Sequence, residues 1–362
     1  MTARSMLFLA PLVFISCGPT PEQEGAKVGW SAIPNAYAKN FELQVRGEER
    51  RLVVFGPQGR TDTVGVHLYR TVQNGGEALP RSIERAVVMS TTQLPFFSAL
   101  GIGDVVVGTA HADQVRDPFF AEAVRQGRVQ DVSRADGVDR ERMTALDPQV
   151  VFDLPFGMSD RRDVADHTVL ITEYLEAHPL GRAEWIRFFG MLFGKEQRAD
   201  SLFKAIEHRY TFLRGQRSLL PAPPSVLFCS HWEGAWFAPP GNSYMATLIE
   251  DAGGRYVYSD RKETGNIPVP LERLLVMGDS IEHLGVLLAY PGAVDRKVLV
   301  GGDPRVLALQ AVQKGAFYGN SSTSDLFGQA VLEPEQILLD LRSIFHPGSA
   351  GGRKSRYFQA IR

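Results

Sequence analysis

The chain has 362 residues, of which 44% are hydrophobic and 22% charged, and its formal net charge is −2. These are the values of a globular protein, and the length suits two lobes of roughly 150 residues each better than one core. The near-neutral charge argues against a nucleic-acid partner, because surfaces that bind nucleic acid are basic. No run after residue 20 reaches the roughly 18 consecutive apolar residues that a membrane span requires.

The first residues have the pattern of a secretory signal, which is not part of the fold. A positive charge precedes the apolar run 6–15, and Cys17 follows almost at once. A cysteine in this place, followed by a polar stretch, looks like a lipoprotein processing site. We therefore predict a signal peptide at 1–17, acylation of Cys17 and a tether at 18–36. Phe14 stands where such sites usually carry leucine, which leaves a plain signal peptide open.

The segment before residue 70 alternates apolar and polar residues as strands do. Residues 41–45 and 52–55 are separated by a turn, which predicts a β-hairpin leading into a third strand near 66–68. From residue 86, short apolar strands alternate with helices. We expect strands at 86–89, 105–108, 128–132, 150–152 and 168–171, and helices at 94–100, 118–125 and 139–146. This alternation indicates a parallel sheet that is covered on both faces.

Residues 179–214 form a helical segment around which the two halves of the chain are arranged. Apolar side chains recur at helical spacing up to Phe193, and the pattern resumes at Ala199 after an interruption at Gly194 and Lys195. Such a segment is either a crossover packed on one sheet or a strut between two lobes, and the spacing does not distinguish them. The α/β patterns on both sides favour the strut.

The alternation of strands and helices restarts after residue 215. We expect strands at 225–229, 256–258, 285–289 and 315–318, and helices at 244–251, 271–277, 305–313 and 333–345. The chain thus divides into a first lobe at 37–178, the connecting helical segment, a second lobe at 215–346 and a tail at 347–362. The tail is expected to fray.

The common catalytic motifs do not fit this sequence. Gly101 and Gly103 begin a glycine pattern, but Val106 stands where a dinucleotide fingerprint needs its third glycine, and the segment runs from helix to strand. The histidines are scattered singly, so no metal site is predicted. We therefore predict no enzyme, no cofactor and no catalytic residue. The second cysteine, Cys229, lies in an apolar run, so no disulfide framework is expected.

Open α/β sheets bind ligands at the loops that follow the carboxyl ends of their strands. In such loops, hydroxyl and amide groups offer hydrogen bonds, and aromatic rings offer a flat wall. The predicted ligand-binding residues are Ser90, Thr91, Thr92, His111 and Arg134 in the first lobe, and Trp232, Trp236, Asn242, Ser243, Tyr244, Arg255 and Tyr258 in the second. Taken singly, each of the aromatic residues 232, 236 and 244 fits a core position equally well.

These patterns, in this order, are similar to those of one known family. Residues 85–92, 141–151 and 251–254 resemble motifs of the periplasmic solute-binding proteins of iron–siderophore and cobalamin ABC importers, the class III type. The resemblance covers about residues 80–345, and the segment 179–185 resembles a lipoprotein branch of the family. It implies two Rossmann-like α/β lobes with parallel-dominated sheets, joined by one long interlobe helix, with a ligand cleft between the lobes.

Within that resemblance, Glu141 and Glu272 match the glutamates, one on each lobe, that dock onto arginines of the permease. Alternatively, both are ordinary first-turn glutamates that the helix dipole favours. The implied protein is a monomeric, membrane-anchored lipoprotein of the periplasm. It captures a metal chelate, hands it to an ABC permease with its ATPase, and binds no nucleic acid.

The implied ligand is a ferric siderophore first, and cobalamin or haem next. Arg134 and Arg255 favour an anionic siderophore, whereas the tryptophans suit a corrinoid or haem face. A stiff connector predicts only a small closure on binding. Two alternatives stay open: a two-lobed enzyme such as a glycosyltransferase, acting through Asp136 or Glu233, and a binder of free metal with clustered histidines.

Overall fold

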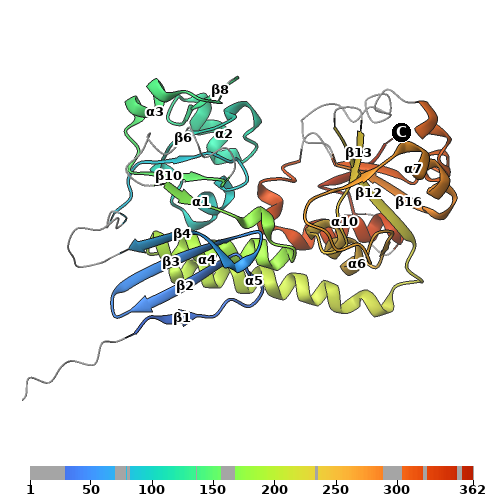
Figure 1. The fold of residues 1–362 in the computed structure, drawn as a ribbon, viewed down its shortest axis with the longest axis horizontal. Helices are drawn as coiled ribbons and strands as arrows, with labels where there is room; N and C mark the ends of the chain where they lie inside the picture. Colours follow the sequence, from blue (N-terminus) through green and yellow to red (C-terminus); the bar gives the residue numbers. More distant parts are fainter. Residues whose placement is uncertain are drawn as a thin grey trace, which may run out of the picture.

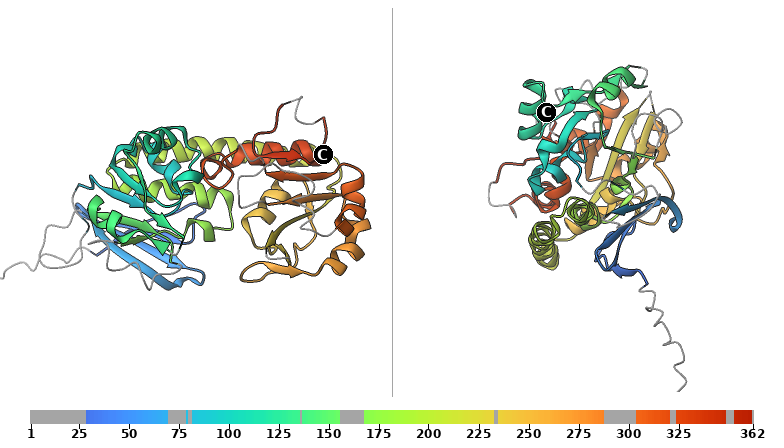
Figure 2. Two further views of the ribbon diagram at one scale, coloured as in Figure 1. Left: turned by 90° about the horizontal axis from the view of Figure 1, so that it is seen from above. Right: turned by 90° about the vertical axis from the view of Figure 1, so that its left-hand side faces the viewer.

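The computed structural model describes residues 29–69, 79, 82–135, 137–155, 168–232, 235–287, 304–320, 324–348 and 353–361. These residues form two α/β lobes that lie side by side, and an antiparallel sheet that packs against the first lobe (Figures 1 and 2). Helix α5 (Glu196–Gly215) runs along one side of the molecule from the first lobe to the second. The two-lobed α/β architecture expected from the sequence is confirmed.

Four antiparallel strands form the sheet that precedes the first lobe. In order across the sheet they are β1 (Ser31–Ile33), β2 (Phe41–Arg46), β3 (Glu49–Gly56) and β4 (Gly59–Tyr69). Phe41 and Leu43 stand opposite Val54 and Leu52, and all four side chains are buried on the face that meets the rest of the lobe. The predicted hairpin and third strand are confirmed, and β1 is a fourth strand that the sequence pattern did not indicate.

The first lobe has a five-stranded sheet in which every pair is parallel. In order, its strands are β11 (Thr168–Leu170), β10 (Val150–Asp153), β5 (Ala86–Val88), β6 (Val106–Thr109) and β7 (Gln130–Asp131). Its helices are α1 (Leu94–Leu100), η1 (Gly103–Val105), η2 (Ala112–Gln114), α2 (Pro118–Arg125), α3 (Arg140–Leu146) and η4 (Glu173–Leu175). A small ribbon of β8 (Ser133–Arg134) and β9 (Gly137–Val138) precedes α3. The short apolar strands are buried because both faces of the sheet are covered.

The connecting segment is a helical hairpin. Helix α4 (Pro179–Leu192) is followed by Gly194, whose φ of 65° lies in the left-handed region that glycine tolerates, and α5 then runs back along α4. The two helices are in close contact, since a Cβ added at Gly190 would stand 2.4 Å from that of Ala199. The expected interlobe helix is α5, with 20 residues and a length of about 30 Å. Helix α4 lies alongside α5 instead of extending it.

The second lobe has a mixed sheet with a parallel centre. Strands β14 (Arg255–Tyr256), β12 (Ser225–Trp232), β16 (His283–Val286) and β17 (Phe317–Asn320) are parallel, and β13 (Ala235–Ala238), β15 (Ile267–Val269) and β18 (Phe358–Ala360) are antiparallel additions. The helices are η5 (Gln216–Leu219), α6 (Tyr244–Asp251), α7 (Leu271–Met277), η6 (Gly278–Ser280), η7 (Pro304–Ala308), α9 (Gln310–Gln313), η8 (Gln329–Leu332) and α10 (Pro334–Phe345). The helix expected at 305–313 is divided between η7 and α9, and the strand expected at 256–258 shortens to β14.

The described residues 353–361 correct part of the expectation of a frayed tail at 347–362. The Asp340 carboxylate accepts the amide hydrogens of Arg356, Tyr357 and Phe358. Strand β18 pairs with β17, and Tyr357 is 1% exposed. Hydrogen bonds to a buried carboxylate and an aromatic anchor therefore hold residues 356–360 in place despite the basic composition around them.

Two buried carboxylates fix the segment between β1 and β2 onto the connector. Glu184 accepts the amide hydrogens of residues 36–38, each at 2.8 Å. Glu176 accepts those of residues 39 and 40 at 3.0 and 2.9 Å, together with the indole N–H of Trp185 at 3.2 Å. A loop without ladder partners needs such acceptors, because buried amides that lack them are costly. The N-terminal sheet is therefore part of the first lobe and its connector.

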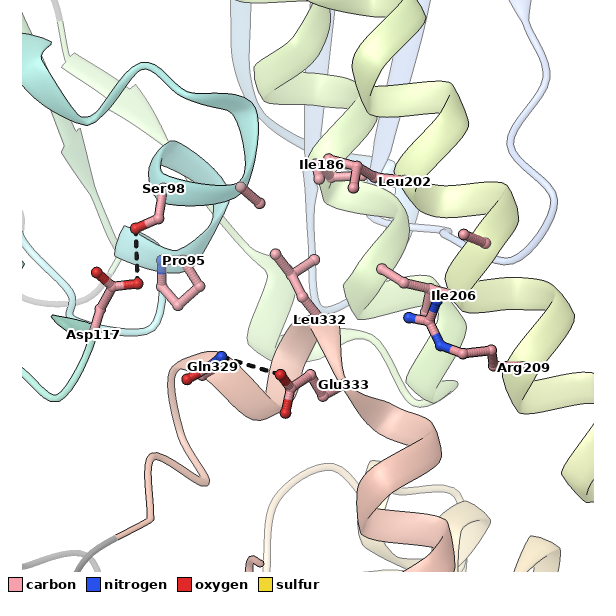
Figure 3. A pocket seen from close by; sticks show the side chains of 12 residues that line it. Pro95, Ser98, Asp117, Ile186, Leu202, Ile206, Arg209, Gln329, Leu332 and Glu333 are labelled. Carbon is pink, nitrogen blue, oxygen red and sulfur yellow. Dashed lines mark hydrogen bonds between the residues drawn. The ribbon is translucent and has the colours of Figure 1, made fainter. Parts of the chain in front are cut away.

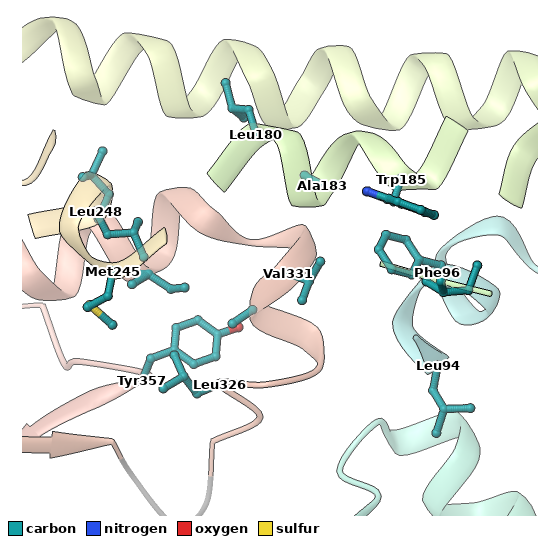
Figure 4. Packing of buried hydrophobic residues seen from close by; sticks show 14 of the residues in the cluster. Leu94, Phe96, Leu180, Ala183, Trp185, Met245, Leu248, Leu326, Val331 and Tyr357 are labelled. Carbon is teal, nitrogen blue, oxygen red and sulfur yellow. The ribbon is translucent and has the colours of Figure 1, made fainter. Parts of the chain in front are cut away.

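The two lobes meet at the first turn of α4 (Figure 4). Leu180 and Ala183 lie between Met245 of α6 in the second lobe and Phe96 of α1 in the first. Helix η8 of the second lobe packs against both α1 and α4. Buried residues of both lobes therefore belong to one continuous hydrophobic core at this joint.

Candidate functional site

The predicted ligand loops of the first lobe lie together at one edge of its sheet. Strands β5, β6 and β7 are parallel neighbours, so the segments after them share the carboxyl edge. These segments carry Ser90, Thr91, Thr92, His111 and Arg134. Hydrogen bonds join the loops internally and to one another: Ser90 Oγ lies 2.9 Å from Thr92 Oγ1, and the His111 amide donates to Ser133 Oγ at 3.2 Å.

Arg134 has its charge balanced by nearby carboxylates. Its guanidinium lies 3.1 Å from Asp139 Oδ1 and 4.0 Å from Glu141 Oε2. Arg134 is half-exposed, so these pairs are individually weak, but together they compete with an incoming anion. The anion-binding role expected of Arg134 is thereby weakened.

The two tryptophans of the predicted aromatic wall point to opposite faces of one hairpin. In the pairing of β12 with β13, His231 stands opposite Trp236, and Trp232 stands opposite Ala235. Alternation along a strand therefore places the two indole rings on different faces. Trp236 is 4% exposed and its ring lies 5.0 Å from that of His231, whereas Trp232 is 52% exposed. Of the two, Trp232 is the exposed one and Trp236 belongs to the core.

Two further residues that we expected at the site lie elsewhere. Tyr258 is 4% exposed, and its hydroxyl donates to Met277 Sδ at 3.7 Å, so it is a core residue. Arg255 stands beside Ser225, the first residue of β12, whereas the candidate loop follows Trp232 at the other end of that strand. The eight residues of β12 separate its two ends by about 23 Å. Arg255 therefore lies at the wrong edge of the sheet for the predicted role.

Asn242 and Ser243 shape the loop in front of α6. Ser243 Oγ accepts the amide hydrogen of Ala246 at 3.2 Å, as a helix N-cap does. Asn242 Oδ1 accepts the amide hydrogen of Glu263 at 3.3 Å. These two bonds position Tyr244, the first residue of α6.

Tyr244 meets a residue that sequence reasoning overlooked, Arg182 of α4. The Arg182 guanidinium lies over the Tyr244 ring, with its carbon 3.9 Å from the ring centroid. The same guanidinium donates to the carbonyl oxygens of Tyr174 at 2.8 Å and Glu176 at 3.3 Å. Burial raises the pKa of Tyr244 to about 12, against the opposing effect of Arg182, so the phenol is neutral at neutral pH. Arg182 thus contacts both lobes.

Glu173 is a second overlooked residue, and it lies three positions after the last residue of β11. Its Oε1 accepts the Thr92 hydroxyl at 2.6 Å, and its side chain is 1% exposed. Burial raises the pKa of this carboxyl, and the Thr92 hydrogen bond and the Arg182 charge oppose that rise. Within the described part of the chain, Glu173 Oε2 and the side-chain amide of Gln93 have no hydrogen-bond partner. An acidic residue just after a strand, at the ligand edge, was the signal in the sequence.

The raised pKa of Glu173 predicts a pH-dependent stability. The folded protein holds this proton to a higher pH than the unfolded chain does, so stability falls as pH rises above the ordinary carboxyl range of about 4. Glu173→Gln keeps an acceptor for Thr92 and cannot ionise. Between about pH 5 and about pH 8, the melting temperature of the variant is expected to decrease less than that of the wild type. An equal loss in both proteins would contradict this prediction, and the exposed Glu141→Gln is the control.

The predicted docking residues, Glu141 and Glu272, lie in the first turns of α3 and α7. Their side chains are 94% and 73% exposed, with Arg134 at 4.0 Å and Arg305 at 3.6 Å respectively. Figure 1 shows α3 and α7 on the side of the molecule away from α5. Exposure on a common side suits contact with one partner, and the docking role stays a prediction.

A groove of about 350 Å³ opens at the joint between α1, the helical hairpin and η8 (Figure 3). Apolar side chains such as Ile186 and Leu332 line it, and none of the predicted ligand residues does. Ser98 donates to Asp117 at 2.7 Å, and Gln329 donates to Glu333 at 3.0 Å, so these polar groups at the groove bond to one another. We interpret it as a gap within the joint.

Within the described ranges, no helix has both the length and the apolarity to cross a membrane. The same residues contain no group of three His, Cys, Asp or Glu side chains placed to hold a metal ion. Cys229 is buried, as expected of a residue in an apolar strand. Cys17, Asp136 and Glu233 lie outside the described residues.

Two α/β lobes joined by a helical connector, with Arg182 of the connector stacked on Tyr244 of the second lobe, have the architecture of a two-lobed binding protein. The chain belongs to the periplasmic binding protein family, whose model matches residues 87–318. Members of this family are substrate-binding components of ABC transporters, so the chain is a binding protein and not an enzyme. The glycosyltransferase alternative is therefore set aside.

Individual relatives are distant in sequence and similar in fold. An uncharacterized lipoprotein of Methanocaldococcus jannaschii is 22% identical over 290 residues, which cover 76% of this chain and 68% of that protein. A periplasmic heme binding protein from Pseudomonas aeruginosa has a TM-score of 0.60 at 18% identity, covering 77% of this chain and 98% of that one. A protein titled as an ABC-type Fe3+-hydroxamate transport system, from Saccharomonospora viridis, has a TM-score of 0.57 at 20% identity, with coverages of 72% and 93%. At these identities the likeness establishes the fold.

Proposed function

We propose that this chain captures a metal chelate between its two lobes and delivers it to an ABC permease. The observation that supports this is that Arg182, on the connector between the lobes, contacts residues of both. Thr92 of the first lobe is bonded to Glu173, and Tyr244 of the second lobe is stacked on Arg182. Loops of two lobes on either side of one connector suit a ligand that is large enough to contact both lobes.

Among chelates, we propose a ferric siderophore first, and haem or cobalamin next. Arg182 provides a cation at the joint, which favours an anionic ligand and takes the role that Arg134 and Arg255 were expected to fill. Trp232 offers an exposed aromatic face, which also suits a flat macrocycle. The two similar structures, one described as a heme binding protein and the other as an Fe3+-hydroxamate transport system, support the same range of ligands.

Delivery of the ligand requires a contact with the permease and a location at the membrane. We propose that Glu141 and Glu272 contact arginines of the permease, and that a lipid on Cys17 tethers a monomeric protein to a membrane facing the periplasm. Exposed ion pairs contribute about 0–1 kcal/mol each, so two of them orient the complex more than they strengthen it. The similarity to a lipoprotein supports the anchor.

Native mass spectrometry with ferric siderophores, haem and cobalamin tests the proposed ligand class. We expect a one-to-one complex with one of these chelates, and recovery of the chelate unchanged. Absence of a complex with all three would contradict the proposal, and a complex with free metal alone would favour the metal-binder alternative.

Replacing Arg182 by alanine is expected to weaken chelate binding about tenfold or more, because a hydrogen bond to a charged group contributes about 1.5–3 kcal/mol. Titration followed by tryptophan fluorescence measures the affinity, and circular dichroism checks that the variant is folded. Arg255→Ala is the matched control, since Arg255 lies at the opposite edge of the second sheet and its loss should leave the affinity unchanged. Equal affinities of the Arg182 variant and the wild type would contradict the assignment.

A further inference from the structure

Each lobe holds a different part of the connector. The C-terminal end of α5 is fixed to the second lobe, where the Tyr210 hydroxyl donates to Asp251 Oδ2 at 2.7 Å. Helix α4 is fixed to the first lobe, where the rings of Phe189 and Phe96 stack with their centroids 5.0 Å apart. A change in the angle between the lobes must therefore be taken up at the joint between these attachments, where the first turn of α4 lies (Figure 4).

At this joint Arg182 is held by one lobe and touches the other. The carbonyl oxygens of Tyr174 and Glu176, which follow the last strand of the first lobe, accept hydrogen bonds from its guanidinium. The opposite partner is the ring of Tyr244, 3.9 Å away, on the second lobe. A cation over an aromatic ring is attracted most strongly where water is excluded, and Arg182 is only partly exposed.

The Arg182–Tyr244 contact also lies between the candidate ligand segments of the two lobes. On the first lobe, the buried Glu173 accepts a hydrogen bond from the Thr92 hydroxyl at 2.6 Å. The charge of Arg182 lowers the pKa of the same carboxyl, against the effect of burial. On the second lobe, Tyr244 is the first residue of α6, the helix whose N-cap is Ser243. Movement of either segment relative to the other must change the contact between the guanidinium and the ring.

We propose that the Arg182–Tyr244 contact is a latch that holds the two lobes at a fixed spacing in the ligand-free protein and thereby sets the rate of ligand release. The statement about release rests on the proposed function, whereas the statement about spacing does not. Tyr244 is then a positioning residue, a role different from the ligand contact expected from the sequence. A latch of this kind would limit the movement of the lobes, in the same direction as the small closure that the stiff connector predicts.

Distances between spin labels on the two lobes test the latch in the absence of any ligand. Asp104→Cys in the first lobe and Val276→Cys in the second are suitable positions, because these residues are 90% and 85% exposed. The full chain carries Cys17→Ser, and Cys229 is buried. Tyr244→Leu is expected to broaden and lengthen the distance distribution, whereas Tyr244→Phe, which keeps the ring, leaves it as in the wild type.

Arg182→Met provides a second variant, which keeps an unbranched apolar stem and removes the guanidinium with its charge. It is expected to broaden the distance distribution as Tyr244→Leu does. If Tyr244→Leu does not fold, this second variant tests the latch in its place. With a bound chelate, either variant should release it about three- to thirtyfold faster. A lowered melting temperature with an unchanged distance distribution would overturn the latch. Failure to bind any chelate would overturn the proposed function and leave the distance measurement valid.

Discussion

Replacing Trp185 by alanine is expected to lower the free energy of unfolding by about 4 kcal/mol. Trp185 is fully buried where the N-terminal sheet meets α4, with its ring centroid 4.8 Å from that of Phe41 and 5.1 Å from that of Phe188. Its truncation removes apolar contacts, leaves a cavity and takes one hydrogen-bond donor from Glu176. Since folded domains are stable by about 5–15 kcal/mol, this is a large part of the total.

Urea denaturation measures the loss, and hydrogen exchange locates it. The amides of β1 to β4 should lose protection first, because Trp185 anchors that sheet. Phe212→Ala is the control: this aromatic residue lies on α5 but is 61% exposed, so its loss should cost under about 0.5 kcal/mol. A loss below about 1 kcal/mol for Trp185→Ala would show that the sheet is held by other contacts.

Replacing Asp340 by alanine is expected to cost about 3 kcal/mol and to release strand β18. The variant leaves the amides of Arg356, Tyr357 and Phe358 without the carboxylate that accepts them. Buried amides without a partner cost about 1–3 kcal/mol, and bonds to a charged acceptor are stronger than neutral ones. Denaturation measures the loss of stability, and faster hydrogen exchange at residues 356–358 identifies its site.

The control for this variant is Asp279→Ala, because Asp279 is an exposed aspartate of η6 and its loss should change stability by less than about 0.5 kcal/mol. Asp340→Asn, which keeps one acceptor oxygen, should fall between the two. Unchanged exchange at residues 356–358 in Asp340→Ala would show that pairing with β17 holds the strand without the carboxylate.

The lobes and their strands could be predicted because they depend on local patterns. Short apolar strands alternating with helices give a parallel sheet whichever residues fill it, and the first lobe follows this rule. The reversal at Gly194 was visible as an interruption, but its direction depends on the packing of Gly190 against Ala199. The ordered tail depends on Asp340, which lies more than ten residues away in sequence.

The candidate site was predicted only in part, because its geometry depends on register and on distant contacts. Whether Trp236 faces a ligand or the core is decided by the pairing of β12 with β13, which composition does not reveal. The position of Arg255 depends on which end of β12 its strand joins. Arg182 was missed because its partner, Tyr244, is 62 residues away and belongs to the other lobe.

The carboxylates Glu176 and Glu184 have a mechanical consequence. A force applied to the chain before Gly29 enters β1, which is paired with β2 through only three residue pairs. Beyond β1 the force reaches residues 36–40, whose amides donate hydrogen bonds to the carboxylates of Glu184 and Glu176. Strand β1 should therefore separate from β2 first, and the hydrogen bonds of residues 36–40 should then resist the force. The lobes, and whatever lies between them, would stay undisturbed under tension.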